Sequence, residues 1–133
     1  MALQRTKLLG IQSVSGISTV GILTVGVTQT AGGVGITSTT YLRGVVMHNT
    51  GLATCVSSLY IYPNGVSAPV TNSNYRLLRI NLASNETFFF EANYPIVLSD
   101  RDQIVVSVTP PLDGGTGIGS VVNYQVLGDT DIT

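Results

Sequence analysis

The chain has 133 residues and a net charge of −1, and only 10% of its residues are charged, against ~25% in typical soluble domains. This length fits one domain. Six basic residues against seven acidic ones leave no basic stripe that could neutralise phosphates, so direct nucleic-acid binding is not expected. Cys55 is the only cysteine, which excludes an internal disulfide and fits assembly in a reducing compartment.

The N-terminal third is unusual because residues 8–42 contain no charged residue and no histidine. Eleven Ser or Thr and seven Gly interrupt its apolar residues, so no run approaches the ~20 residues of a membrane-spanning helix, and no membrane is expected as a partner. We find no signal peptide pattern. A neutral, β-prone stretch that is exposed to water is an aggregation hazard. We therefore expect another protein subunit to cover it.

Residues 1–16 are predicted to form an extended arm, and residues 17–133 a single β-sandwich domain with a compact core at about 41–128. Arg5 and Lys7 are the only charges in the first 42 residues, and they would suit an acidic groove on a partner. Leu8, Leu9 and Ile11 would supply the apolar anchor beside them. The alternative is that the arm is a first strand in its own sheet.

Hydrophobic residues alternate with a period of two, which is typical of half-buried strands. Ile104, Val106 and Val108 fall on one face of their segment, and Val122, Tyr124 and Val126 on one face of another. The expected strands lie near residues 2–12, 17–28, 41–48, 56–62, 76–82, 86–92, 95–98, 103–109 and 118–127.

Turn residues separate these segments, for example at Asn49-Thr50-Gly51 and Asp113-Gly114-Gly115. An Ala31-Gly32-Gly33 turn is expected to be flexible, and no segment gives an amphipathic helix of ten residues. The predicted fold class is all-β: an antiparallel, jelly-roll-like β-sandwich of seven to nine strands with an extended N-terminal arm.

No group of residues has the pattern of a catalytic or metal centre. His48 and Cys55 are a turn apart, but a nucleophile pair also needs an orienting group and an oxyanion site. The pairs Asp100/Asp102 and Asp129/Asp131 could bind a hard cation, or lie in a turn and a solvated tail. We expect no enzyme activity, no cofactor and no metal.

Four tyrosines could form a contact surface, because the ring is apolar and the hydroxyl is polar: Tyr60, Tyr62, Tyr75 and Tyr94. Tyr60 and Tyr62 share one face of their predicted strand, and we take them as interface candidates. Packing at the edge of the core, contact with a partner protein and glycan stacking all stay open for them.

From Tyr41 onward, the order of motifs resembles small β-sandwich virion proteins of tailed bacteriophages. The resemblance covers about 41–128 and is carried by residues 41–50 (YLRGVVMHNT), 59–65 (LYIYPNG), 85–91 (NETFFFE), 95–98 (PIVL) and 121–128 (VVNYQVLG). Such proteins often have Gly-Asp before the strand that matches 103–109, where this chain has Arg101-Asp102. The resemblance implies a structural, non-enzymatic role in a particle, usually as a trimer or larger ring.

The function predicted from the sequence is that of a capsid decoration or cement protein in a virion that is assembled in the host cytoplasm. Its expected partners are copies of itself, with a trimer favoured, and the major capsid protein or other virion proteins. The alternatives are a neck, tail or receptor-adaptor component, and a module that binds carbohydrate or a host surface.

Overall fold

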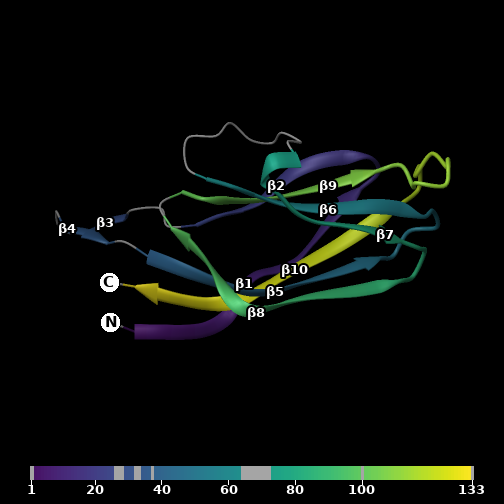
Figure 1. The fold of residues 1–133 in the computed structure, drawn as a ribbon. Helices are drawn as coiled ribbons and strands as arrows, with labels where there is room; N and C mark the ends of the chain where they lie inside the picture. Colours follow the sequence, from purple (N-terminus) through teal and green to yellow (C-terminus); the bar gives the residue numbers. More distant parts are fainter. Residues whose placement is uncertain are drawn as a thin grey trace.

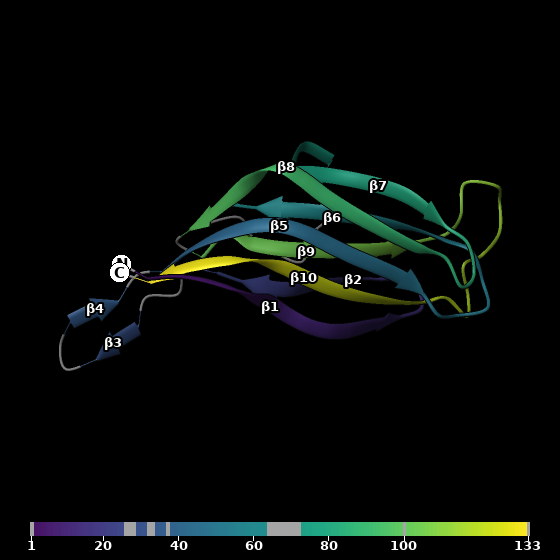
Figure 2. The same ribbon diagram turned by 90° about the horizontal axis from the view of Figure 1, so that it is seen from below.

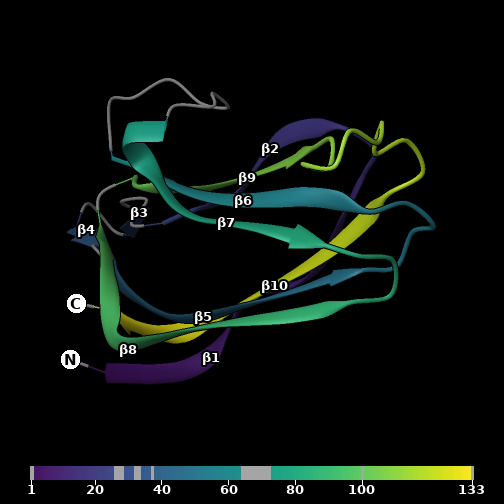
Figure 3. The same ribbon diagram turned by 45° about the vertical axis from the view of Figure 1, so that its right-hand side comes forward.

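The computed structural model describes residues 2–25, 29–31, 34–36, 38–63, 73–99 and 101–132, without the side chains of 2–9, 29–31, 34–36, 38, 99, 131 and 132. Two four-stranded sheets face each other (Figure 1, Figure 3). Sheet A has the order β1 (Ala2–Ser15), β10 (Val121–Ile132), β5 (Ser38–Asn49), β8 (Thr87–Ser99). Sheet B has the order β2 (Ser18–Thr24), β9 (Gln103–Thr109), β6 (Cys55–Tyr62), β7 (Arg76–Leu82).

The strands pair in a nested order that makes the sandwich a jelly roll. Among the sandwich strands, the first pairs with the last, β1 with β10, and β2 pairs with β9. Further in, β5 pairs with β8 and β6 with β7. All four pairs are antiparallel, as in a long hairpin folded over on itself. The pairs β10–β5 and β6–β9 then complete the two sheets, so the predicted antiparallel β-sandwich is confirmed.

The core lies between the sheets and consists of the alternating apolar residues that face inward. Ile104, Val106 and Val126 are 0% exposed, in agreement with the alternation seen in the sequence. Tyr124 also points inward, and its hydroxyl lies 2.6 Å from the Ser57 hydroxyl. This hydrogen bond satisfies two polar groups that would otherwise be costly to bury.

The structure corrects the prediction that residues 1–16 leave the sandwich. β1 pairs along its length with β10 of its own chain, from Ala2 opposite Ile132 to Ser15 opposite Val121. Pairing satisfies backbone groups of β1 that an extended arm would leave to water. The core also begins before residue 41, because Val14 and Ile22 belong to its buried cluster.

Other strand limits also differ from those expected. β8 is one strand where two were predicted, and it runs through Pro95 because a proline is tolerated on the edge of a sheet. Residues 92–95 bulge out between Glu91 and Ile96, whose partners on β5 are only two residues apart. β10 continues to Ile132. A small hairpin, β3 (Gln29–Ala31) with β4 (Val34–Ile36), flanks the predicted Gly32-Gly33 turn, whose glycines lie outside the described residues.

Arg101 adopts a backbone conformation that glycine favours. Its φ is +69°, in the left-handed region that L residues avoid. Two backbone hydrogen bonds tie this turn to Val25: Arg101 N–H donates to the Val25 carbonyl at 2.8 Å, and Val25 N–H donates to the Asp102 carbonyl at 3.0 Å. An arginine therefore occupies a backbone position that favours glycine, at the cost of local strain.

Helical structure is almost absent from the described residues. One 3-10 turn, η1 (Ser73–Tyr75), precedes β7. In the part of the chain that the structure describes, no helix is long and apolar enough to cross a membrane.

Candidate interaction surfaces

Tyr60 and Tyr62, two of the predicted interface residues, are buried in the folded chain. They are 5% and 0% exposed, and their rings stack with centroids 5.9 Å apart. Tyr75, from η1, packs against Tyr62 at 5.1 Å. The tyrosines thus form a small packed cluster with Val105 on the outer face of sheet B. Because Tyr60 and Tyr62 are buried within this cluster, their rings do not form a contact surface in this structure.

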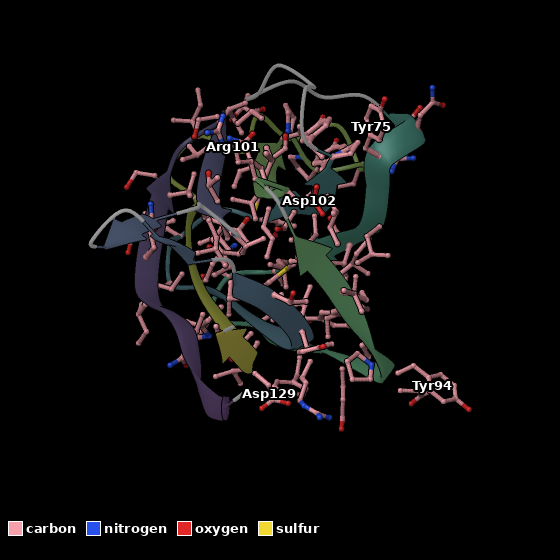
Figure 4. All side chains as sticks on the ribbon, turned by 90° about the vertical axis from the view of Figure 1, so that its left-hand side faces the viewer. Tyr75, Tyr94, Arg101, Asp102 and Asp129 are labelled. Atoms are coloured by element: carbon pink, nitrogen blue, oxygen red, sulfur yellow. The ribbon has the colours of Figure 1, made fainter. Side chains whose placement is uncertain are left out.

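Tyr94 is the tyrosine that the fold leaves accessible. It is 86% exposed at the bulge of β8 and projects from the molecule far from Tyr75 (Figure 4). Val97 on the same strand is 57% exposed. The four tyrosines named as one possible surface are therefore separated into a packed cluster of three and a single exposed ring.

The predicted arm residues all lie on β1, and only one of their side chains is described. Register places Arg5 opposite Asp129 and Lys7 opposite Leu127 on β10. The side chains of Arg5, Lys7, Leu8 and Leu9 lie outside the described residues. Ile11 is 72% exposed, so it is available as the apolar contact that the sequence predicted.

A polar row crosses the outer face of sheet A beside Ile11. Register aligns Ser13, Asn123, His48 and Thr87 across its four strands. The Ser13 hydroxyl donates to Asn123 Oδ1 at 2.5 Å, and His48 Nδ1 lies 2.7 Å from Thr87 Oγ1. The row borders a shallow hollow of about 230 Å³, lined by Ile11, Val46, His48, Asn123, Tyr124 and Gln125. Amides and one imidazole can donate and accept hydrogen bonds there, and none of the described lining residues is a serine, threonine, cysteine or lysine.

His48 and Cys55 do not face each other. His48 lies on the outer face of sheet A, whereas Cys55 is 0% exposed and belongs to the core. Burial raises the pKa of the Cys55 thiol, which favours the protonated, unreactive form. The arrangement does not provide a nucleophile–base pair.

The acidic residues do not form a metal site in the described part of the chain. Asp129 is buried at 1% exposed and pairs with Arg43 through Nε and Oδ2 at 2.5 Å. Asp100 and the side chain of Asp131 lie outside the described residues. Within the described residues, no three His, Cys, Asp or Glu side chains group as cation ligands.

Sequence reasoning missed a group of exposed aliphatic side chains on connections of the sandwich. These connections lie at the end of the sandwich remote from the chain termini (Figure 1). We call this group the apolar tip. It consists of Ile17 (45% exposed), Leu52 (94%), Leu112 (68%) and Ile118 (77%). Three connections supply them: the β1–β2 turn, the β5–β6 loop and the β9–β10 loop. The sequence signal for these residues was an apolar residue next to a turn glycine or proline. A search for alternation along strands does not detect that signal, because these residues lie outside the strands.

The loops of the apolar tip are held by a buried asparagine. Asn49 is 0% exposed. Its Oδ1 accepts from Gly51 N–H at 3.0 Å and from Val121 N–H at 3.4 Å. Its Nδ2 donates to the Ala53 carbonyl at 2.8 Å and to the Leu82 carbonyl at 3.2 Å. One side chain thus joins the β5–β6 loop to the end of β7 and to the start of β10.

Close backbone packing fixes the same loops further. Leu52 N–H donates to the Gly119 carbonyl at 3.1 Å, and Gly16 N–H donates to the Ser120 carbonyl at 2.8 Å. A Cβ on Gly51 would lie 2.3 Å from the Gly119 carbonyl oxygen, so only glycine fits there. Leu52 and Ile118 therefore lie on loops that are joined to each other by backbone hydrogen bonds.

No protein-family model and no curated protein matches the chain. Among solved structures, it is similar to the infectious bursal disease virus Gx strain structure, with 11% identity and a TM-score of 0.46 over 98% of this chain and 35% of that one. The Gt strain structure of the same virus gives 10% identity and a TM-score of 0.43 over 98% and 32%. This chain thus spans about a third of the length of those viral chains.

A carbohydrate-binding module of family CBM36, in complex with calcium and xylotriose, is similar with 8% identity and a TM-score of 0.34 over the whole of both chains. At these identities and TM-scores, the three structures give no indication of what this chain binds.

Proposed function

We propose that this chain is a structural protein of a virus particle, a capsid decoration or cement protein that binds the major capsid protein as a homo-oligomer, with a trimer favoured. The observation that carries the proposal is the apolar tip. Leu52 and Ile118, 94% and 77% exposed, are held on hydrogen-bonded loops. Exposed apolar groups of this kind mark contact surfaces, and a preorganised surface loses less entropy on binding.

The fold and composition are consistent with this role. Eight-stranded jelly rolls occur in viral capsid proteins and in lectins, so the fold alone does not select a function. A surface with few charges resembles the interfaces of permanent assemblies. The bacteriophage origin and the decoration role rest on the resemblance of residues 41–128 and on these surface properties.

A pelleting assay tests the proposal. Empty capsids assembled from the major capsid protein of the same genome are mixed with the purified chain and sedimented. We expect the chain to pellet with the capsids, and we expect Leu52→Ser and Ile118→Ser each to weaken binding about tenfold or more, as loss of a buried apolar anchor would.

Leu77→Ser is the matched control, because Leu77 is also an exposed leucine (42%) but lies on β7, away from the apolar tip. It should pellet like the wild type. A chain that stays in the supernatant at micromolar capsid concentrations would overturn the decoration proposal. Pelleting with isolated necks or tails instead would assign it to the adaptor alternative.

Carbohydrate binding through Tyr60 and Tyr62 is not proposed, because both rings are buried and cannot stack on a sugar.

A further inference from the structure

The neutral N-terminal stretch becomes one side of the folded molecule. β1 is an edge of sheet A and β2 is an edge of sheet B. Both edges lie along the same side of the sandwich, and β7 and β8 lie along the opposite side (Figure 2). We call residues 10–24, which include the second half of β1, the β1–β2 turn and β2, the neutral side. No residue in it is charged.

The opposite side is protected in the way that exposed sheet edges usually are. Arg76 and Arg79 are exposed on β7, and Glu91 is exposed on β8. β8 also carries Pro95 within its four-residue bulge. Charges, prolines and bulges on an edge strand prevent it from pairing with another chain. The β7–β8 side is therefore protected against pairing with a strand of another chain.

The neutral side has less of this protection. β1 and β2 contain bulges near residues 7–12 and 21–23, but their register is regular over Gln12–Ser15 and Ser18–Gly21. Neither strand contains a proline or, from residue 8 onward, a charge. Two large aliphatic side chains are exposed along this side, Ile11 at 72% and Ile17 at 45%.

The absence of charge points to another copy of the same chain as the partner. When copies meet around a symmetry axis, each charge near the axis faces an identical charge, and such like-charge contacts are costly. A neutral surface with small polar and aliphatic side chains meets itself without that cost. A partner chosen by opposite charge would need charged residues here, and the neutral side has none.

We infer that the neutral side is the surface through which copies of this chain associate around a symmetry axis. The inference deepens the proposed function, because it assigns the contact of the proposed homo-oligomer. It leaves the other three residues of the apolar tip, Leu52, Leu112 and Ile118, for contact with the capsid.

Sedimentation of the purified full chain tests the inference without any capsid. The wild type is expected to form an oligomer at micromolar concentration. Ser15→Lys and Thr24→Lys, each placing a charge at an exposed position of the neutral side, should weaken association about tenfold or more. Asn81→Lys is the matched control, because Asn81 is an exposed polar residue on β7, and it should associate like the wild type.

Mixing variants separates self-association from contact with a different partner. Ser15→Lys and Ser15→Glu should each be dissociated alone and should associate when mixed, because opposite charges then face each other. Thermal unfolding confirms that each variant is folded. A monomeric wild type, an Asn81→Lys that dissociates as fully as Ser15→Lys, or a mixture that stays dissociated would each overturn the inference. A chain that associates normally but does not pellet with capsids would overturn only the proposed function.

Discussion

At the scale of single residues, the polar groups that matter most are those inside the fold. Asn49 and the Ser57–Tyr124 pair are buried and hydrogen-bonded, so each specifies one arrangement of the elements around it. Asn49 was assigned to a turn from the sequence, but its hydrogen bonds to Leu82 and Val121 join residues far apart in the chain. No local pattern contains that information.

Replacing Asn49 is expected to loosen the end of the sandwich. Asn49→Ala leaves the N–H groups of Gly51 and Val121 and the carbonyls of Ala53 and Leu82 without this partner. Each buried group left unsatisfied costs about 1–3 kcal/mol, so we expect a loss of about 3 kcal/mol or more in the free energy of unfolding, measured in urea. Asn81→Ala, at an exposed position, should change it by less than about 0.5 kcal/mol. Equal effects of the two substitutions would contradict this role.

Arg101 offers a gain in stability. Its φ of +69° costs an L residue roughly 1 kcal/mol that glycine does not incur. We expect Arg101→Gly to raise the free energy of unfolding by about 0.5–1 kcal/mol, measured by denaturant titration. Arg101→Ala removes the same side chain but keeps the strain, so it should give no gain. A stabilised alanine variant would show that the arginine side chain, and not the backbone, is the source of the effect.

At the scale of elements, the main correction concerns β1. The sequence permitted either an arm or a first strand, and pairing with β10 decides in favour of the strand. The same pairing makes β1 the edge of sheet A, so its neutral residues lie on a side of the molecule and can contact other copies without leaving their own sheet.

Truncation of β1 is expected to destabilise the domain. Deleting residues 2–12 removes the partner of β10 between Tyr124 and Ile132. We expect the thermal midpoint to fall by at least about 5 °C. An unchanged midpoint would restore the arm interpretation. In the intact chain, hydrogen exchange should show slow amides within residues 12–15, as paired strands do.

At the scale of the whole molecule, the low charge leaves few groups that can make stability depend on pH. Two buried groups should do so at alkaline pH. Burial raises the pKa of the Tyr124 phenol above its ordinary 10.0, and burial raises the pKa of the Cys55 thiol above its ordinary 9.0. Above these ordinary values the unfolded chain releases protons that the folded chain retains, so stability is complete below about pH 9 and falls as the pH rises.

Urea unfolding between pH 8 and 11 measures this dependence. The wild type should lose stability progressively above about pH 9. Tyr124→Phe removes one of the two groups, and it should therefore show a shallower decline above about pH 10, from a lower starting stability because the hydrogen bond to Ser57 is lost. Parallel declines in the two proteins would rule out Tyr124 as a source of the pH dependence.

The sequence by itself determined the fold class, most strands and the neutral character of the N-terminal third. It could do so because strand periodicity, turn residues and charge are local properties. Ile104, Val106 and Val126 were correctly assigned to the core for this reason. Register and strand order depend on contacts between distant residues, so only the tertiary structure decided that β1 is an edge strand, that Tyr60 and Tyr62 are buried, and that Leu52 and Ile118 share one end of the sandwich.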